Sequence, residues 1–169
     1  MFTMRPATGD DTSAVKDVIL ARSAWLEVRG RPTWRDSADD LAAQASKGYM
    51  WVLESDSSGV IGCTALQGEH PPWGWTPAGL AQPALYLYTT ATHPDWRHCK
   101  PGALIAFWAV DHAARNDKRW VRRGCFFPGL VGYYETQGFH LAHEVVRTRH
   151  RVYLMARRAQ HLAAGAILR

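Results

Sequence analysis

The sequence contains little cysteine and no long apolar run. Its three cysteines among 169 residues, an odd number, argue against a disulfide framework and are typical of a reducing compartment. No stretch reaches the roughly 20 apolar residues of a membrane-spanning helix, and the first residues form no apolar signal core. We therefore expect a cytoplasmic protein with no membrane partner.

A long block of one charge is also missing. The formal net charge is only +5, and the densest basic run, residues 147–151, is typical of a solvated turn between two late strands. This balance gives little support to a nucleic-acid partner, so we expect none. The positive net charge is compatible with a binding site whose basic entrance steers an anionic cofactor toward it.

The sequence has no metal-binding signature either. His93, His98 and Cys99 lie close together along the chain, as do His140 and His143. Neither group has the paired Cys-x-x-Cys or His-x-x-x-His spacing that is typical of a metal site. No metal is predicted.

What the chain does contain is enough apolar residues for one well-packed domain. Hydrophobic residues make up 47% of it and charged residues 21%, which is typical of a globular protein. No internal repeat or linker interrupts the sequence. We predict one domain over residues 1–158, followed by a tail at residues 159–169.

The chain is organised around residues 85–114. Residues 85–92 are mostly aromatic or β-branched, which predicts a strand, and Pro94 ends it. A helix then begins at Pro101, which suits the first helical position. Lys100 is not a capping residue, so the leading N–H groups of this helix are left for an anion such as phosphate, or for water. The predicted buried stripe of the helix consists of Ala103, Phe107, Val110 and Ala114.

The rest of the chain alternates between predicted strands and helices. The predicted strands are residues 3–7, 49–55, 60–66, 119–126, 139–147 and 152–157. The predicted helices run from a capping box at Thr8 and Asp11 to Gly30, from 37 to 46, and from 128 to 137 before Gly138, with a frayed helix from Ala159. Residues 67–82 fit no regular element and are predicted to form a loop. This order predicts an α/β fold with one mixed sheet and helices on both of its faces.

Three stretches resemble the signature motifs of the GNAT acyltransferase superfamily. They occur in the family's order and spacing and extend over nearly the whole chain. The resemblance implies the single-domain GNAT-like fold and acetyl-CoA as co-substrate. In chain order the stretches are Met4-Arg5-Pro6-Ala7-Thr8 with Asp11, then His93-Pro94-x-x-Arg97-x-x-Lys100-x-Gly102-Ala103, and then Tyr133-Tyr134-Glu135-x-x-Gly138-Phe139.

The resemblance also implies which residues hold acetyl-CoA. Backbone N–H groups from His98 to Ala103 would cradle the pyrophosphate, and the end of the central strand would line the pantetheine arm. Two departures stand out, because Lys100 replaces a glycine of the motif and Pro101 removes one N–H group. Lys100 could instead add positive charge. The implied cofactor-binding residues are Ala91, Thr92, Arg97, His98, Cys99, Lys100, Gly102 and Ala103.

The same resemblance suggests the catalytic groups. Tyr134 matches the tyrosine that protonates the departing thiolate, a role that suits a phenol with a pKa near 10. Packing in the core is the alternative for this residue. Glu69 is the candidate general base by position, with His70, His93 or a bound water as alternatives.

In the GNAT family the acceptor site is built from the loop between the first two helices and the loop before the central strand. In this chain those segments carry aromatic residues beside carboxylates, which suit a cationic amine. Covering the edge of the core is the alternative use of the tryptophans. The predicted substrate-binding residues are Trp25, Glu27, Trp34, Trp73, Trp75, Tyr86 and Tyr88.

Together these features predict an N-acetyltransferase. It would transfer an acetyl group from acetyl-CoA to a primary amine of a small molecule or amino-acid-like metabolite. The alternative is a non-catalytic GNAT-fold module that binds acyl-CoA or another ligand without turnover. The expected partner is a small-molecule amine, and a homodimer is left open.

Overall fold

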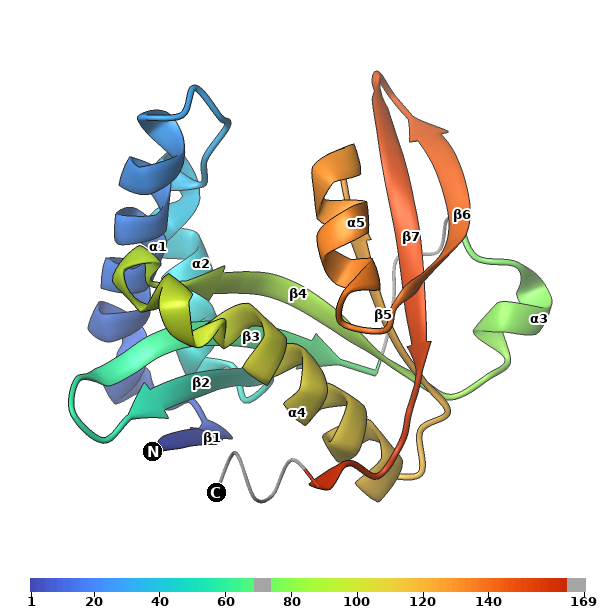
Figure 1. Cartoon of the computed structure of the whole chain (residues 1–169), viewed down its shortest axis with the longest axis horizontal. Coiled ribbons are helices and arrows are strands. Elements are labelled where there is room, and N and C mark those ends of the chain that lie inside the picture. The colour runs from blue at the N-terminus through green and yellow to red at the C-terminus, as the bar shows by residue number, and fades with distance from the viewer. Residues whose placement is uncertain (69–73, 164–169) are drawn as a thin grey trace. The chain divides into compact units, whose positions relative to one another are not determined.

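The strands of the protein form one mixed sheet (Figure 1). The computed structural model describes residues 1–68 and 74–163, and its seven strands lie in the order β1-β2-β3-β4-β5-β7-β6. The pairs β1–β2, β2–β3, β5–β7 and β6–β7 are antiparallel, whereas β4 and β5 are parallel. The predicted α/β class is confirmed. The strands are β1 Phe2–Pro6, β2 Met50–Ser55, β3 Gly59–Gln67, β4 Ala84–Thr92, β5 Trp120–Cys125, β6 His140–Arg147 and β7 His150–Arg158.

The chain is divided into two compact units. The first contains residues 1–66 and 88–105 together with Ala163, and the second contains the described residues of 67–87 and 106–162. Strand β4 and helix α4 (Pro101–Arg115) each contribute residues to both units.

The core of the first unit lies between its helices and one face of the sheet. Helix α1 (Thr12–Glu27) and helix α2 (Ala38–Ala42) turn their apolar side chains inward because these recur at helical spacing. The predicted second helix is broken up, since α2 is flanked by the 3₁₀ turns η2 (Arg35–Ser37) and η3 (Ala43–Ser46). The buried cluster consists of Ala7, Val15, Val18, Ile19, Ala38, Ala42, Ala45, Met50, Val52, Cys63 and Ala91.

The opposite face of β3 is covered by the start of α4. A Cβ atom added to Gly62 would lie 3.3 Å from the Cδ1 atom of Ile105, whereas the neighbouring Cys63 belongs to the cluster with α1. Successive side chains of a strand point to opposite faces. Helices therefore cover both faces of the sheet, as the sequence predicted.

Helix α4 begins at Pro101 as predicted, but it buries a different stripe. Of the predicted positions Ala103, Phe107, Val110 and Ala114, only Val110 is fully buried. Most residues of this helix are apolar, so the spacing predicted a helix without showing which side faces inward. The buried apolar side chains in the body of the helix are Ile105, Ala106, Ala109, Val110 and Ala113.

Two predictions about short segments were wrong. The predicted loop contains helix α3 (Pro77–Leu80), in which the Oγ1 atom of Thr76 accepts a hydrogen bond from the Gly79 N–H at 3.1 Å. Four residues are too few to show a helical period. Residues 159–162 are not helical, because the N–H group of Ala159 donates to the Arg119 carbonyl at 2.8 Å. The rest of the predicted tail helix, residues 164–169, lies outside the described residues.

In the second unit, β5 has a helical segment on each face. The guanidinium of Arg123 contacts Tyr134 of α5 (Pro128–Glu135), whereas Arg122 donates to the carbonyl of Gly79 in α3. Because Arg122 and Arg123 are consecutive strand residues, α3 and α5 lie on opposite faces of β5. None of the helices in the described parts of the chain is long and apolar enough to cross a bilayer.

Candidate functional site

The central strand β4 is distorted where it approaches its end. Thr89 has a φ of 41°, which a β-branched residue rarely adopts. The backbone around it is held by Thr64 of β3, whose hydroxyl contacts the Thr90 hydroxyl at 2.9 Å and the Tyr88 carbonyl at 3.2 Å. Sequence reasoning missed this distortion, because Thr89 lies in a run of residues that mostly favour a regular strand.

The turn after β4 leads into α4 through a second left-handed residue. The 3₁₀ turn η4 (Pro94–Cys99) is followed by Lys100, which has a φ of 51°. The Lys100 N–H donates to the Arg97 carbonyl at 3.0 Å, and the Ala103 N–H donates to the Lys100 carbonyl at 3.0 Å. Pro101 has no N–H group, so Gly102 is the first residue of α4 that carries one.

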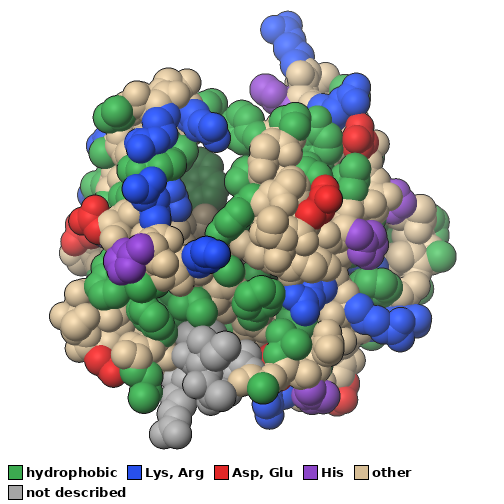
Figure 2. Space-filling model, in the orientation of Figure 1, with side chains coloured by type: hydrophobic (Ala, Val, Ile, Leu, Met, Phe, Trp, Pro, Cys, Tyr) green, Lys and Arg blue, Asp and Glu red, His purple; other side chains and the backbone are tan. Residues whose placement is uncertain are grey.

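Three arginines surround the indole ring of Trp25, and we call them the arginine cluster. The guanidinium carbon of Arg29 lies 3.6 Å from a ring centroid of Trp25, that of Arg22 lies 5.1 Å away, and that of Arg97 lies 5.2 Å away. Figure 2 shows Lys and Arg side chains gathered where the end of α1 lies in Figure 1. These distances are typical of cation–π contacts. The ring of Trp25 is therefore already in contact with cations of the protein itself.

The other predicted substrate residues of the first unit are also partly engaged. The carboxylate of Glu27 accepts hydrogen bonds from Arg35 at 2.7 and 3.0 Å and from the Thr33 hydroxyl at 3.2 Å. The bonds from Arg35 lower the pKa of Glu27. Trp34 remains 46% exposed.

In the second unit Tyr134 lies against a buried cation. The guanidinium carbon of Arg123 is 3.7 Å from the centre of the Tyr134 ring and 5.6 Å from that of Phe139, and Arg123 is 7% exposed. Burial raises the pKa of Tyr134, and the positive charge of Arg123 opposes part of that rise. The phenol is therefore protonated at neutral pH, as a general acid must be. Its neighbour Tyr133 is 42% exposed.

Trp75 and Tyr86, two of the predicted substrate-binding residues, contact a second buried arginine, Arg122. The guanidinium carbon of Arg122 lies 4.4 Å from the Trp75 ring centroid, and its Nη1 donates to the Tyr86 hydroxyl at 2.6 Å. The Nη2 atom donates to the Gly79 carbonyl at 2.9 Å, while the buried Nε has no hydrogen-bond partner among the described residues. Trp75 and Tyr86 therefore help to fix the segment around α3 on the sheet.

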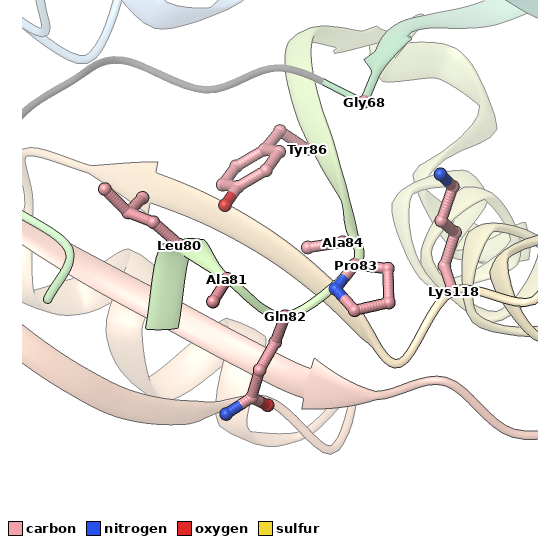
Figure 3. Close-up of a pocket in the computed structure, with 8 residues that line it drawn as sticks. All are labelled: Gly68, Leu80, Ala81, Gln82, Pro83, Ala84, Tyr86 and Lys118. Carbon is pink, nitrogen blue, oxygen red and sulfur yellow. The ribbon is translucent and has the colours of Figure 1, made fainter. Parts of the chain in front are cut away.

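A cavity of about 440 Å³ opens beside Tyr86 (Figure 3). The side chain of Gln82 points away from Tyr86 in Figure 3, and its Oε1 accepts a hydrogen bond from Trp120 Nε1 at 2.5 Å. Of the predicted site residues that the structure describes, Tyr86 alone lines this cavity. The lining residues are Gly68, Leu80, Ala81, Gln82, Pro83, Ala84, Tyr86 and Lys118.

The proteins that are similar to this chain were found by comparison of structures, not of sequences. No family model and no curated protein matches the sequence. An acetyltransferase of the GNAT family from Listeria monocytogenes 4b F2365 is similar with a TM-score of 0.74 and 16% identity, over 93% of this chain and 94% of its own. The ribosomal-protein-S18-alanine N-acetyltransferase of Escherichia coli is similar with a TM-score of 0.66 and 14% identity, over 96% and 97% of the two chains. This chain has the GNAT fold.

A third structure agrees with this assignment. The mosquito arylalkylamine N-acetyltransferase like 5b has a TM-score of 0.66 and 14% identity, and the match covers 94% of this chain and all of the mosquito chain, 100%. At identities of 14–16% the likeness concerns the GNAT fold itself.

Within the GNAT fold the predicted residues are divided between the two units. The first unit contains Trp25, Glu27, Trp34, Tyr88, Ala91, Thr92 and residues 97–103, and it brings Trp25 next to Arg97. The second contains Trp75, Tyr86 and Tyr134. Glu69, His70 and Trp73 lie outside the described residues. Among the residues that are described, no group of three His, Cys, Asp or Glu side chains is arranged to hold a metal ion.

Sequence reasoning missed the buried arginines of β5. A signal was present, because Arg122 and Arg123 are adjacent charges between Val121 and Cys125 in a strand otherwise suited to burial. Two consecutive residues of a strand face opposite sides of the sheet. A charge on each face of a central strand indicates buried contacts on both sides.

Proposed function

We propose that the protein transfers an acetyl group from acetyl-CoA to a primary amine. The segment from β4 to α4 carries this proposal: it combines a left-handed Lys100 at the glycine position of the motif with the small residues Gly102 and Ala103 at the start of a long helix. The likeness to GNAT acetyltransferases in fold supports it. The acceptor amine belongs to a small molecule or an amino-acid-like metabolite.

The residues of this turn suit a phosphate group. Arg97 and Lys100 are both exposed cations, and the N–H group of Gly102 lies in the first turn of α4, at the positive end of the helix dipole. Acetyl-CoA would supply the acetyl group as an activated thioester. The chain would supply the contacts to its phosphates.

Tyr134 would hold the proton that the reaction needs. As the amine nitrogen forms its bond to the acetyl carbon and the carbon–sulfur bond breaks, the leaving thiolate takes the phenolic proton. The resulting phenolate would lie against the guanidinium of Arg123, which stabilises negative charge in a buried setting. The amine gives up its own proton to a base, and solvent restores the phenol.

The reaction also needs a general base that takes a proton from the amine. His93 is the described candidate, and its Nδ1 atom accepts a hydrogen bond from the Asp95 N–H at 3.3 Å. The neutral ring then carries its proton on Nε2, so His93 would take the substrate proton at Nδ1 once that bond is broken. Glu69 and His70 remain candidates outside the described residues.

One observation favours a second function, a module that binds acyl-CoA without turnover. Within the predicted cradle, the N–H groups of Lys100 and Ala103 donate to carbonyls of the chain, and Pro101 has none. A cradle with fewer free donors would bind the pyrophosphate less tightly and orient it less strictly.

Thermal unfolding with and without acetyl-CoA tests the proposal, with desulfo-CoA as a control. A ligand at about 100 times its Kd adds roughly 2.7 kcal/mol, which raises the Tm of a chain of this size by about 5–10 °C. We expect such a shift. If saturating acetyl-CoA produces none, both the transferase and the module are ruled out.

Tyr134→Phe then separates the enzyme from the module. We expect it to lower kcat by about 10²–10⁴-fold, because the general acid is removed, while the acetyl-CoA-induced rise in Tm persists. Tyr133→Phe is the matched control and should retain the parent rate, since Tyr133 is exposed. A parent that binds acetyl-CoA but acetylates no member of a broad amine panel would favour the module.

A further inference from the structure

The arginine cluster joins two separate segments of the first unit. Arg22 lies in α1 and Arg29 just beyond its end, whereas Arg97 belongs to the turn η4 that leads to Lys100. All three guanidinium carbons lie within 5.2 Å of a ring centroid of Trp25. Like charges gathered this closely repel one another, and contact with one indole ring offsets that repulsion only in part.

The carboxylate of Glu27 is committed to another partner. Glu27, which lies between these arginines in the sequence, is bonded to Arg35 through both carboxylate oxygens. Within residues 1–68 and 74–163, no carboxylate forms an ion pair with Arg29 or Arg97. The described fold therefore leaves the charge of these two arginines without an acidic counterpart.

Packing accounts for only part of the cluster. Arg29 is exposed, and one of its N–H groups donates to the Trp25 carbonyl at 2.8 Å, which caps the end of α1. A guanidinium has five N–H donors, so most of those on Arg29 are available to a ligand. Arg97 is likewise exposed. Planar, multidentate donors of this kind are the usual partners of carboxylate and phosphate groups.

The cluster adjoins the end of the central strand. The Nη2 atom of Arg22 donates to the Thr92 hydroxyl at 2.7 Å, and Thr92 is the last residue of β4. The cluster thus lies beside the backbone that leads into the proposed phosphate cradle. A ligand held there would be close to the reacting end of the strand.

We propose that the arginine cluster, chiefly through Arg29, binds a carboxylate or phosphate group of the acceptor, while Arg97 contacts the cofactor phosphates, so that the substrate is an amine that also carries an anionic group. This inference rests on the proposed acetyltransferase function and names its substrate class. It replaces the expected contact of Trp25 and Glu27 with the cation of the amine, because the Trp25 ring is in contact with arginines and Glu27 is neutralised by Arg35.

Matched pairs of amines test the proposal: tyramine against tyrosine, tryptamine against tryptophan, and ethanolamine against serine. Each pair differs by one carboxylate. We expect the parent to prefer the amino acid in at least one pair. Arg29→Gln should reduce that preference by about tenfold or more, mainly through KM, because a charge-assisted contact is lost. Arg31→Gln removes the same charge two residues away and should leave the preference unchanged.

A binding measurement is independent of turnover. Inorganic phosphate at constant ionic strength should raise the Tm of the parent and of Arg31→Gln, and should raise that of Arg29→Gln distinctly less. A phosphate effect that is the same in all three proteins overturns the anion site. If phosphate binding depends on Arg29 but every amine pair reacts equally or not at all, the assignment of the anion to the acceptor is overturned.

The anion could also come from the cofactor, and 3′-dephospho-acetyl-CoA distinguishes this source. We expect Arg29→Gln and the parent to bind acetyl-CoA with similar affinity. If Arg29→Gln weakens acetyl-CoA binding as much as loss of the 3′-phosphate does in the parent, the cluster serves the cofactor and the acceptor assignment fails. Failure of the proposed function is recognised separately, by the absence of any acetyl-CoA-induced rise in Tm.

Discussion

Lys100 occupies a backbone conformation that ordinarily favours glycine. Its φ of 51° lies in the left-handed region, and it stands at the glycine position of the GNAT motif. A residue with a side chain costs about 1–2 kcal/mol there, whereas glycine costs roughly 0.5–1 kcal/mol in backbone entropy. The lysine is exposed, so its ammonium group is available to a ligand at the turn before α4.

Substitutions of Lys100 separate the effect of its charge from the effect of its left-handed backbone conformation. We predict that Lys100→Gly keeps or raises the free energy of unfolding by up to about 1 kcal/mol, measured by urea denaturation. Both Lys100→Gly and the control Lys100→Ala, which keeps the left-handed strain, should bind acetyl-CoA about tenfold more weakly by calorimetry, because a phosphate contact is lost. Tighter binding by both variants would show instead that the side chain crowds the cradle.

Arg123 explains why phenylalanine is the right replacement for Tyr134. The guanidinium is buried, and in the described part of the chain no carboxylate pairs with it, so the ring faces of Tyr134 and Phe139 are its principal neighbours. Burial lowers the pKa of Arg123. Tyr134→Phe keeps the ring over this cation and removes only the hydroxyl, whereas alanine would leave a buried charge exposed to a cavity.

At the scale of the element, the end of α5 depends on Gly138. Its φ is 84°, and the following Phe139 N–H donates to the Tyr134 carbonyl at 3.1 Å, which closes the helix as in a Schellman motif. A Cβ atom at Gly138 would lie 3.0 Å from the guanidinium of Arg157. The turn thus requires both the left-handed conformation and the missing side chain.

We predict that Gly138→Ala lowers the free energy of unfolding by about 1–2 kcal/mol, because alanine is strained at positive φ. Gly132→Ala is the matched control in the same helix, where an added Cβ meets nothing within 4 Å. That variant should be more stable than the parent by roughly 0.5–1 kcal/mol, since alanine favours the helical state. Urea unfolding measures both, and equal effects of the two substitutions would contradict the assigned role of Gly138.

At the scale of the whole molecule, acid stability depends on a network that ties the first strand to its neighbours. The guanidinium of Arg5 in β1 donates to both oxygens of Asp11, each at 2.8 Å, and to both oxygens of Glu54 in β2 at 2.8 and 2.9 Å. Asp11 also accepts a hydrogen bond from the Thr8 N–H at 2.8 Å, in the capping box that the sequence predicted. Bonds from Arg5 lower the pKa of Asp11 and the pKa of Glu54.

The pH dependence of the free energy of unfolding follows from these lowered pKa values. A carboxyl whose pKa is lower in the folded state contributes stability that is complete above its unfolded pKa, about 3.9 for Asp and 4.3 for Glu, and is lost as the pH falls through the folded value. We predict that Asp11→Asn lowers the free energy of unfolding at pH 7 by about 1–3 kcal/mol and that this difference shrinks below about pH 4. The exposed Asp10→Asn is the control, and a difference that stays constant with pH would contradict the network.

Local sequence was sufficient for the strands, the longer helices and the most distinctive turns, but not for the short helix α3. The strand that ends before Pro94, the helix that begins at Pro101 and the capping box at Asp11 follow from properties of single residues: ring constraint, β-branching and a short acidic side chain. The turn before α4, which resembles a GNAT motif, could be predicted from the same residues. The direction of the buried face of α4 could not, because nearly all sides of that helix are apolar.

Only the tertiary structure decided which charges face one another. Arg97 lies far along the chain from Trp25, and Arg123 lies on a different element from Tyr134, so their contacts depend on strand order and on which side of the sheet each residue takes. The sequence by itself therefore determined the strands, the longer helices and the GNAT-like order, since these depend on neighbouring residues. Folding determined that Trp25 is in contact with arginines rather than available to a cationic substrate, since that depends on residues brought together from distant segments.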